Sequence, residues 1–146
     1  MKPRPHIFKA SVTSVLTLFV FGLVYFLVFL IAGGIIYVLS IIPVINKLVG
    51  WFFNIRGDTP DMLIILLSTM IACVISLKVQ ERINKDNSTI CLSCIITGSC
   101  LVLIHVASLI VNIMNKSGCL ANIIQIIGGI ALIVEGRKYI VKGNES

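Results

Sequence analysis

Two cysteines separated by two residues form the only pattern in this 146-residue chain that is associated with metal or redox chemistry. Cys91-Leu92-Ser93-Cys94 matches the spacing at which paired thiolates bind zinc or exchange with a disulfide. A structural zinc site needs four ligands, however, and the sequence has no second C-x-x-C and no histidine pair at ligand spacing. We therefore expect these cysteines to fill space as small apolar side chains. The sequence predicts no metal and no cofactor.

A single histidine, His105, stands well inside the long uncharged stretch Asn87–Asn115. An ionisable group at mid-bilayer is costly and is a functional candidate by default, and imidazole titrates near neutral pH. His105 could therefore relay protons or bind a metal. The alternative is a neutral imidazole that bonds to an amide such as Asn122 or Gln125 and only joins two helices. No Asp or Glu lies in such a stretch as its partner, which favours the alternative.

The polar side chains of this stretch lie close to one helical face, because their separations of 8, 3 and 4 residues follow the helical period. The next stretch likewise carries two amides on one side. Two interpretations remain open. The polar faces could pack against one another in a compact bundle, or they could line a water-filled path, which would require an oligomer or an open bundle. The candidate polar residues are Thr97, His105, Ser108, Asn112, Asn122 and Gln125.

Signatures of the common enzyme classes are absent from the sequence. It contains no G-x-x-x-x-G-K-[ST], no G-x-S-x-G, no H-E-x-x-H and no paired carboxylates. An enzyme acting on a lipid or thiol would have only Cys91, Cys94 and His105 to work with. We therefore expect a protein without catalytic chemistry and predict no catalytic residue.

The composition indicates that lipid surrounds much of the chain. Hydrophobic residues make up 58% and charged residues only 12%, against about 25% charged in soluble domains. The net charge of +6 could suggest nucleic acid, but the basic residues flank apolar stretches. In that position they orient membrane segments and contact anionic lipid headgroups. We expect the lipid bilayer, anionic lipids included, to be a partner, and we exclude nucleic acid.

Charged residues divide the chain into uncharged stretches that predict an all-α integral membrane protein. A spanning helix needs roughly 20 residues. Thr59-Pro60-Asp61 is a favourable helix start, and Asp86 with the polar residues after it supplies a turn and a cap. The segment before Asp86 is predicted to extend the second helix. The expected fold is a four-transmembrane-helix bundle, one domain over residues 1–146, with spans at about 11–40, 60–80, 89–114 and 118–135.

The first stretch, Ala10–Asn46, is long enough for one helix or for two that turn at Gly33-Gly34. The positive-inside rule decides between them. Four spans with an inside N-terminus place nine of the twelve Lys and Arg residues inside and three outside. A fifth span would move Lys78, Arg82 and Lys85 outside. We therefore predict one tilted first span, cytoplasmic N- and C-termini, and location in the plasma (inner) membrane.

Pro43 ends this span, and the segment at about 44–55 is predicted to be an interfacial helix on the outer face. Trp51 would anchor it at headgroup depth, where aromatic residues accumulate. A re-entrant loop is the alternative.

Small residues four apart in the second span form the clearest packing signal. Ser68, Ala72 and Ser76 follow the small-xxx-small pattern through which helices associate in lipid. This face favours a structural or accessory subunit that associates with itself or with another membrane protein. The polar residues of the third span and the aromatic segment at Trp51 support an alternative, a channel, pore or membrane-perturbing effector.

Overall fold

The computed structural model describes residues 6–42, 47, 61–115 and 118–142, and these form an all-helical structure. The helices are α1 (Ile7–Ser40), α3 (Asp61–Ile83), α4 (Asn87–Met114) and α5 (Leu120–Lys142). All four are long and apolar enough to cross a membrane. The predicted all-α class with four candidate spans is thereby confirmed. The predicted interfacial helix at 44–55, with Trp51, lies outside the described residues except for Lys47.

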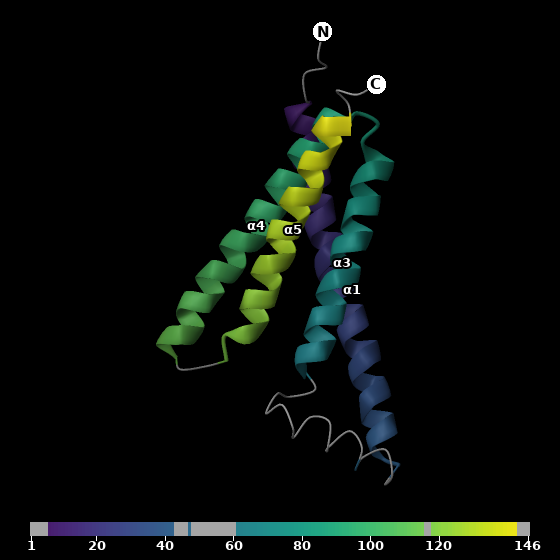
Figure 1. The fold of residues 1–146 in the computed structure, drawn as a ribbon, viewed down its shortest axis with the longest axis vertical. Helices are drawn as coiled ribbons and strands as arrows, with labels where there is room; N and C mark the ends of the chain where they lie inside the picture. The colour runs from purple at the N-terminus through teal and green to yellow at the C-terminus, as the bar shows by residue number, and fades with distance from the viewer. Residues whose placement is uncertain (1–5, 43–46, 48–60, 116–117, 143–146) are drawn as a thin grey trace.

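The helices run up and down in chain order, so the start of α1 and the end of α5 lie at the same end of the molecule (Figure 1). Helix α5 packs most extensively on α4, and α3 packs most extensively on α1. Smaller contacts between α1 and α4 and between α3 and α5 join the two pairs. Toward the end that holds the α4–α5 connection, the two pairs diverge (Figure 1). We call this the divergent end and the opposite end the joined end.

Helix α1 is continuous over 34 residues, which excludes a turn at Gly33-Gly34. At 1.5 Å per residue it is about 51 Å long, well above the roughly 30 Å of a hydrocarbon core. Such a helix must tilt or project from the core. It ends at Ser40, shortly before Pro43, which cannot supply the backbone N–H that a continuing helix would need.

The predicted start of α4 is confirmed, because Asp86 caps it. Its carboxylate accepts hydrogen bonds from the backbone N–H groups of Ser88 (3.4 Å) and Thr89 (3.0 Å), and from the Thr89 hydroxyl (2.7 Å). Partial burial raises the pKa of Asp86, but the three hydrogen bonds and the nearby charge of His6 outweigh it, so this pKa lies below its ordinary value. The predicted extension of the second helix is also confirmed, since α3 continues to Ile83.

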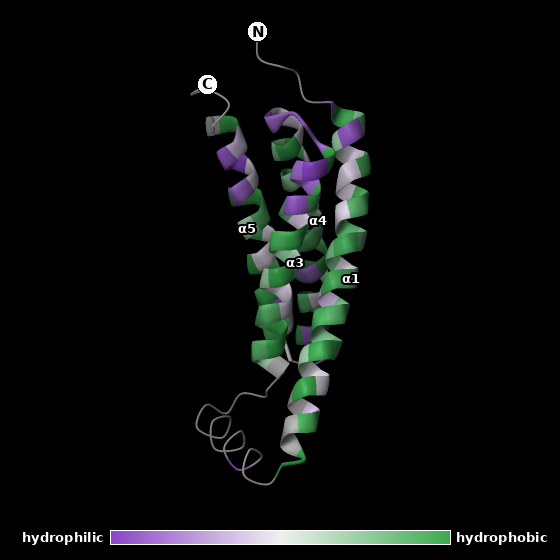
Figure 2. Ribbon diagram, turned by 90° about the vertical axis from the view of Figure 1, so that its right-hand side faces the viewer, coloured by the Kyte–Doolittle hydropathy of each residue, from purple (hydrophilic) through white to green (hydrophobic). Residues whose placement is uncertain are grey.

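The buried residues of α1 and α4 lie toward the joined end, whereas those of α3 and α5 are spread along both helices. Each helix contributes one residue to the apolar cluster of the interior: Phe21, Ala72, Leu101 and Leu132. Beyond Phe21 in α1 and beyond Leu101 in α4, no described side chain is buried. Hydrophilic residues also gather at the joined end (Figure 2). Packing therefore covers α1 and α4 along one half of their length and leaves their apolar side chains exposed along the other, as expected where lipid is the solvent.

Candidate functional site

The polar face of α4 packs mainly against α5. On α4 the residues at 94, 98, 101, 105, 108 and 112 are separated by alternating steps of four and three, and the same alternation relates 122, 125, 129, 132 and 136 on α5. This is the heptad spacing with which two helices keep one face together over several turns. We call this contact the α4–α5 interface. It includes five of the six predicted polar residues.

Glycines set the close approach of these two helices. A Cβ atom built on Gly98 would lie 2.5 Å from the Gly129 carbonyl oxygen, and one on Gly136 would lie 2.4 Å from the Cβ of Cys94. Real Cβ atoms do not approach other atoms so closely. Small residues permit such contact between backbones, which is a main source of helix association in lipid. The glycines therefore allow the backbones of α4 and α5 to approach each other closely.

His105 lies beside Asn122, in the part of this interface nearer the divergent end. Its Nδ1 is 3.4 Å from the Asn122 Oδ1, so the tautomer with hydrogen on Nδ1 donates a weak hydrogen bond to the amide. His105 is half-buried and Asn122 is buried. This is the pairing expected of a histidine that joins two helices.

The other predicted polar residues do not form one continuous line. Ser108 is half-buried one turn beyond His105, and the Asn112 amide donates to the Gly118 carbonyl oxygen at 3.2 Å. Gln125 is buried in α5, and its Oε1 has no hydrogen-bond partner among the described residues. Thr97 lies on a different side of α4, in a second polar group near the joined end. The structure thus separates Thr97 from His105 rather than bringing them into one site.

That second group, the inner polar cluster, contains residues that the sequence analysis did not single out. Thr13 Oγ1 donates to Asn84 Oδ1 (3.3 Å), and Ser14 Oγ donates to the Ser93 carbonyl oxygen (3.1 Å). Gln80 donates through Nε2 to Thr97 Oγ1 at 3.2 Å. All these side chains are buried. The signal in the sequence was the repeat of small and hydroxyl residues Ala10, Thr13, Ser14 and Thr17, which share one face of α1.

Both cysteines of the C-x-x-C pattern are buried next to this cluster. Cys94 Sγ is 2.7 Å from Gln80 Oε1 and packs against Gly136. Among the described residues, no group of three His, Cys, Asp or Glu side chains could hold a metal ion. Cys91 and Cys94 therefore occupy buried, packed positions in this structure.

The small-residue face of α3 points into the bundle. Ser68, Ala72 and Ser76 are all fully buried, and Ala72 belongs to the apolar cluster that joins the four helices. The hydroxyls of Ser68 and Ser76 have no partner among the described residues. This face is therefore occupied within the chain.

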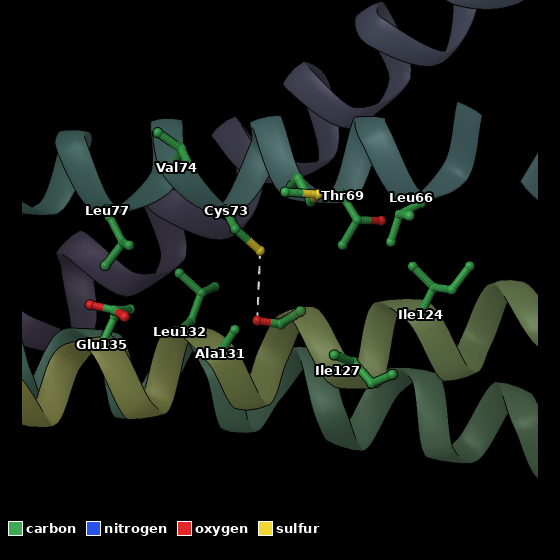
Figure 3. A pocket seen from close by; sticks show the side chains of 12 residues that line it. Leu66, Thr69, Cys73, Val74, Leu77, Ile124, Ile127, Ala131, Leu132 and Glu135 are labelled. Carbon is green, nitrogen blue, oxygen red and sulfur yellow. Dashed lines mark hydrogen bonds between the residues drawn. The ribbon is translucent and has the colours of Figure 1, made fainter. Parts of the chain in front are cut away.

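A cleft of about 290 Å³ separates α3 from α5 beside that face (Figure 3). Cys73 approaches the Gly128 carbonyl oxygen across it, with its Sγ at 3.6 Å. Glu135 lies at one end of the cleft, and Leu66 and Ile124 lie at the other.

No known protein family, curated protein or solved structure matches this chain.

Proposed function

We propose that this chain is an integral membrane protein that serves as a structural or accessory subunit, and that it associates with a second membrane-embedded chain through the part of α1 beyond Phe21. The observation that carries the proposal is that intramembrane polar groups form hydrogen bonds within the chain. His105 pairs with Asn122, Asn112 pairs with Gly118, and Gln80 pairs with Thr97. Polar groups that bond between helices, as His105 and Gln80 do, stabilise a bundle.

The orientation proposed is the one with both termini in the cytoplasm of a plasma (inner) membrane. Nine basic residues against three support it through the positive-inside rule. The joined end, where hydrophilic residues gather, would then face the cytoplasm (Figure 2). Its exposed basic side chains would contact anionic headgroups.

The distal part of α1 supports the proposed association. A Cβ atom built on Gly22, Gly33 or Gly34 would meet no atom of another described segment within 4 Å. Glycine costs about 1 kcal/mol relative to Ala in a helix, so three unpacked glycines need another reason. Close contact with a helix from another chain supplies one. The small-residue face of α3 does not serve here, because it is buried within the chain.

Gly33→Leu tests the association. We expect it to reduce self-association, or capture of a partner, in lipid nanodiscs. The helical content and thermal unfolding of the monomer should stay unchanged, because no other described segment comes within 4 Å of a Cβ at Gly33. Ile31→Leu is the matched control, since Ile31 is exposed on the same part of α1. Unchanged assembly in Gly33→Leu, Gly22→Leu and Gly34→Leu would contradict the proposed surface.

A membrane-impermeant maleimide tests the orientation. Asn115 and Lys85 are exposed at opposite ends of α4. On intact cells, Asn115→Cys should gain labelling over the parent protein, and Lys85→Cys should gain it only after the membrane is permeabilised. The reverse pattern would refute the proposed orientation and leave the helix assignments untouched.

A further inference from the structure

The cleft between α3 and α5 has the size and lining of a site for one lipid chain (Figure 3). Its lining runs from Leu66 to Leu77 along α3, which corresponds to about 17 Å at the helical rise. Its volume of about 290 Å³ is at the low end for ligand pockets. These dimensions are too small for a helix and suit a single acyl chain. The apolar lining residues are Leu66, Met70, Val74, Leu77, Ile124, Ile127, Ala131 and Leu132.

The cleft is held open at a defined width by contacts between α3 and α5. The Tyr139 hydroxyl donates to the Glu81 carboxylate beyond one end of the cleft, and Cys73 approaches the Gly128 carbonyl oxygen within it. A Cβ on Gly128 would lie 2.7 Å from Thr69, so the helices already touch there. These contacts fix the spacing of α3 and α5 beside the cleft.

One charged residue, Glu135, belongs to the lining. It lies toward the joined end, and its carboxylate forms an ion pair with Lys138 on the next turn. The two side chains stay accessible, with 44% of Glu135 and 61% of Lys138 exposed. A carboxylate has room for several donors, so the bond from Lys138 does not saturate it.

We propose that this cleft binds a phospholipid with an ethanolamine headgroup. One acyl chain fills the apolar cleft, the ammonium group donates to Glu135, and the phosphate accepts from Lys138. The inference rests on the membrane location given above, but not on the association through α1.

Charge complementarity favours this headgroup over the other common ones. A primary ammonium supplies N–H donors to a carboxylate, and hydrogen bonds between charged groups are the stronger kind. Choline is cationic but has no N–H to donate. A glycerol headgroup would leave the phosphate beside Glu135 without any cation of its own. A headgroup with both a phosphate and a primary ammonium complements both members of the Glu135–Lys138 pair.

Lipid competition provides the test. Purified protein would be reconstituted with equal amounts of phosphatidylethanolamine, phosphatidylcholine and phosphatidylglycerol with the same acyl chains, and the bound lipid would be identified by native mass spectrometry. We expect the ethanolamine lipid to be preferred. Glu135→Gln should lower that preference roughly tenfold, since it removes a charge-assisted bond. Ala131→Phe should displace all three lipids by filling the cleft.

Ile130→Phe is the control for bulk, because Ile130 is exposed on α5 but does not line the cleft. Equal binding of the three lipids by the unmodified protein would overturn the proposal, as would an unchanged preference in Glu135→Gln. If Ala131→Phe does not fold, these two measurements still decide the question. Gly33→Leu should retain the lipid preference, so failure of the association and failure of the lipid site can be told apart.

Discussion

His105 and Asn122 show how a polar residue in a membrane span can be satisfied by its own chain. Each alone would leave a donor or acceptor in an apolar setting, which costs free energy. Together they form one hydrogen bond between neighbouring helices, with 3.4 Å between the His105 Nδ1 and the Asn122 Oδ1. The sequence analysis gave two interpretations of His105, and this geometry favours the one in which the imidazole joins helices.

A double-mutant cycle on this pair measures the interaction. We expect His105→Ala and Asn122→Ala to destabilise the protein singly and to show a coupling free energy of about 0.6 kcal/mol, with about 1.7 kcal/mol as the upper end for such pairs in membranes. Thermal unfolding in detergent would give the four values. Ser108→Ala, on the same face, serves as the control and should not couple to Asn122. A coupling of zero between His105 and Asn122 would contradict the helix-joining role.

Asp86 makes the stability of the α4 start depend on pH. Because its pKa is lowered in the folded protein, the carboxylate stabilises the fold fully above the unfolded value of about 3.9, and this stabilisation is lost as the pH falls through the folded pKa. Asp86→Ala should cost about 1 kcal/mol near neutral pH, with a smaller difference in acid.

Asp86→Asn is the matched variant for this effect, since its amide oxygen can still cap α4 but does not titrate in this range. Thermal unfolding between neutral pH and pH 3 should show a weaker pH dependence for it than for the parent protein. Identical pH profiles for the two proteins would contradict the role of the Asp86 charge.

At the scale of helices, the α4–α5 interface depends on glycine where the two backbones approach. Gly98→Ala places a Cβ 2.5 Å from the Gly129 carbonyl oxygen, a backbone atom, and 2.6 Å from the Ile133 side chain. We expect a loss of about 1–3 kcal/mol in unfolding free energy, as for other overpacked interiors. Equilibrium unfolding in mixed micelles would measure it.

Gly22→Ala is the natural comparison, because the space around Gly22 is open. It should be neutral or slightly stabilising, since Ala favours a helix over Gly. If Gly22→Ala and Gly98→Ala lowered the unfolding free energy equally, backbone flexibility rather than packing would determine the effect of Gly98→Ala.

The helices themselves were predictable from the sequence, because length, apolar composition and caps are local properties. The extension of α3 to Ile83 and the Asp86 cap follow from such signals. The inner polar cluster was missed because Thr13 and Ser14 face Asn84 and Ser93, which are about 70 to 80 residues away. Lipid tails are as apolar as leucine, so hydrophobicity does not reveal which helix faces which in a membrane.

At the scale of the whole molecule, α1 and α4 are packed toward the joined end but not toward the divergent end. We expect spin labels at Phe8 and Asn87 to give a narrow distance distribution, and labels at Val38 and Ile113 to give a broad one. All four sites are exposed, and the buried residues of α1 and α4 lie near the first pair only. Double electron–electron resonance on protein in nanodiscs would measure these distance distributions. Attaching the labels to a non-natural ketone residue would leave the native cysteines unmodified.

A narrow distribution for Val38 and Ile113 in the monomer would contradict this account. If this distance distribution narrows only when a second chain binds, and the narrowing is lost in Gly33→Leu, the divergent end takes part in the proposed association.

The divergence of the two helix pairs could not have been predicted from the sequence, because it depends on how the pairs cross rather than on any one helix.

The α4–α5 interface also bears on how the chain enters the bilayer during synthesis. His105, Asn122 and Gln125 would each be exposed to lipid if their helices inserted one after the other. The connection between the two helices is short, from Asn115 to Cys119, so they can meet as soon as both have been made. We therefore expect α4 to remain at the insertion machinery until α5 emerges, and the two to enter lipid together as a hairpin in which His105 already pairs with Asn122.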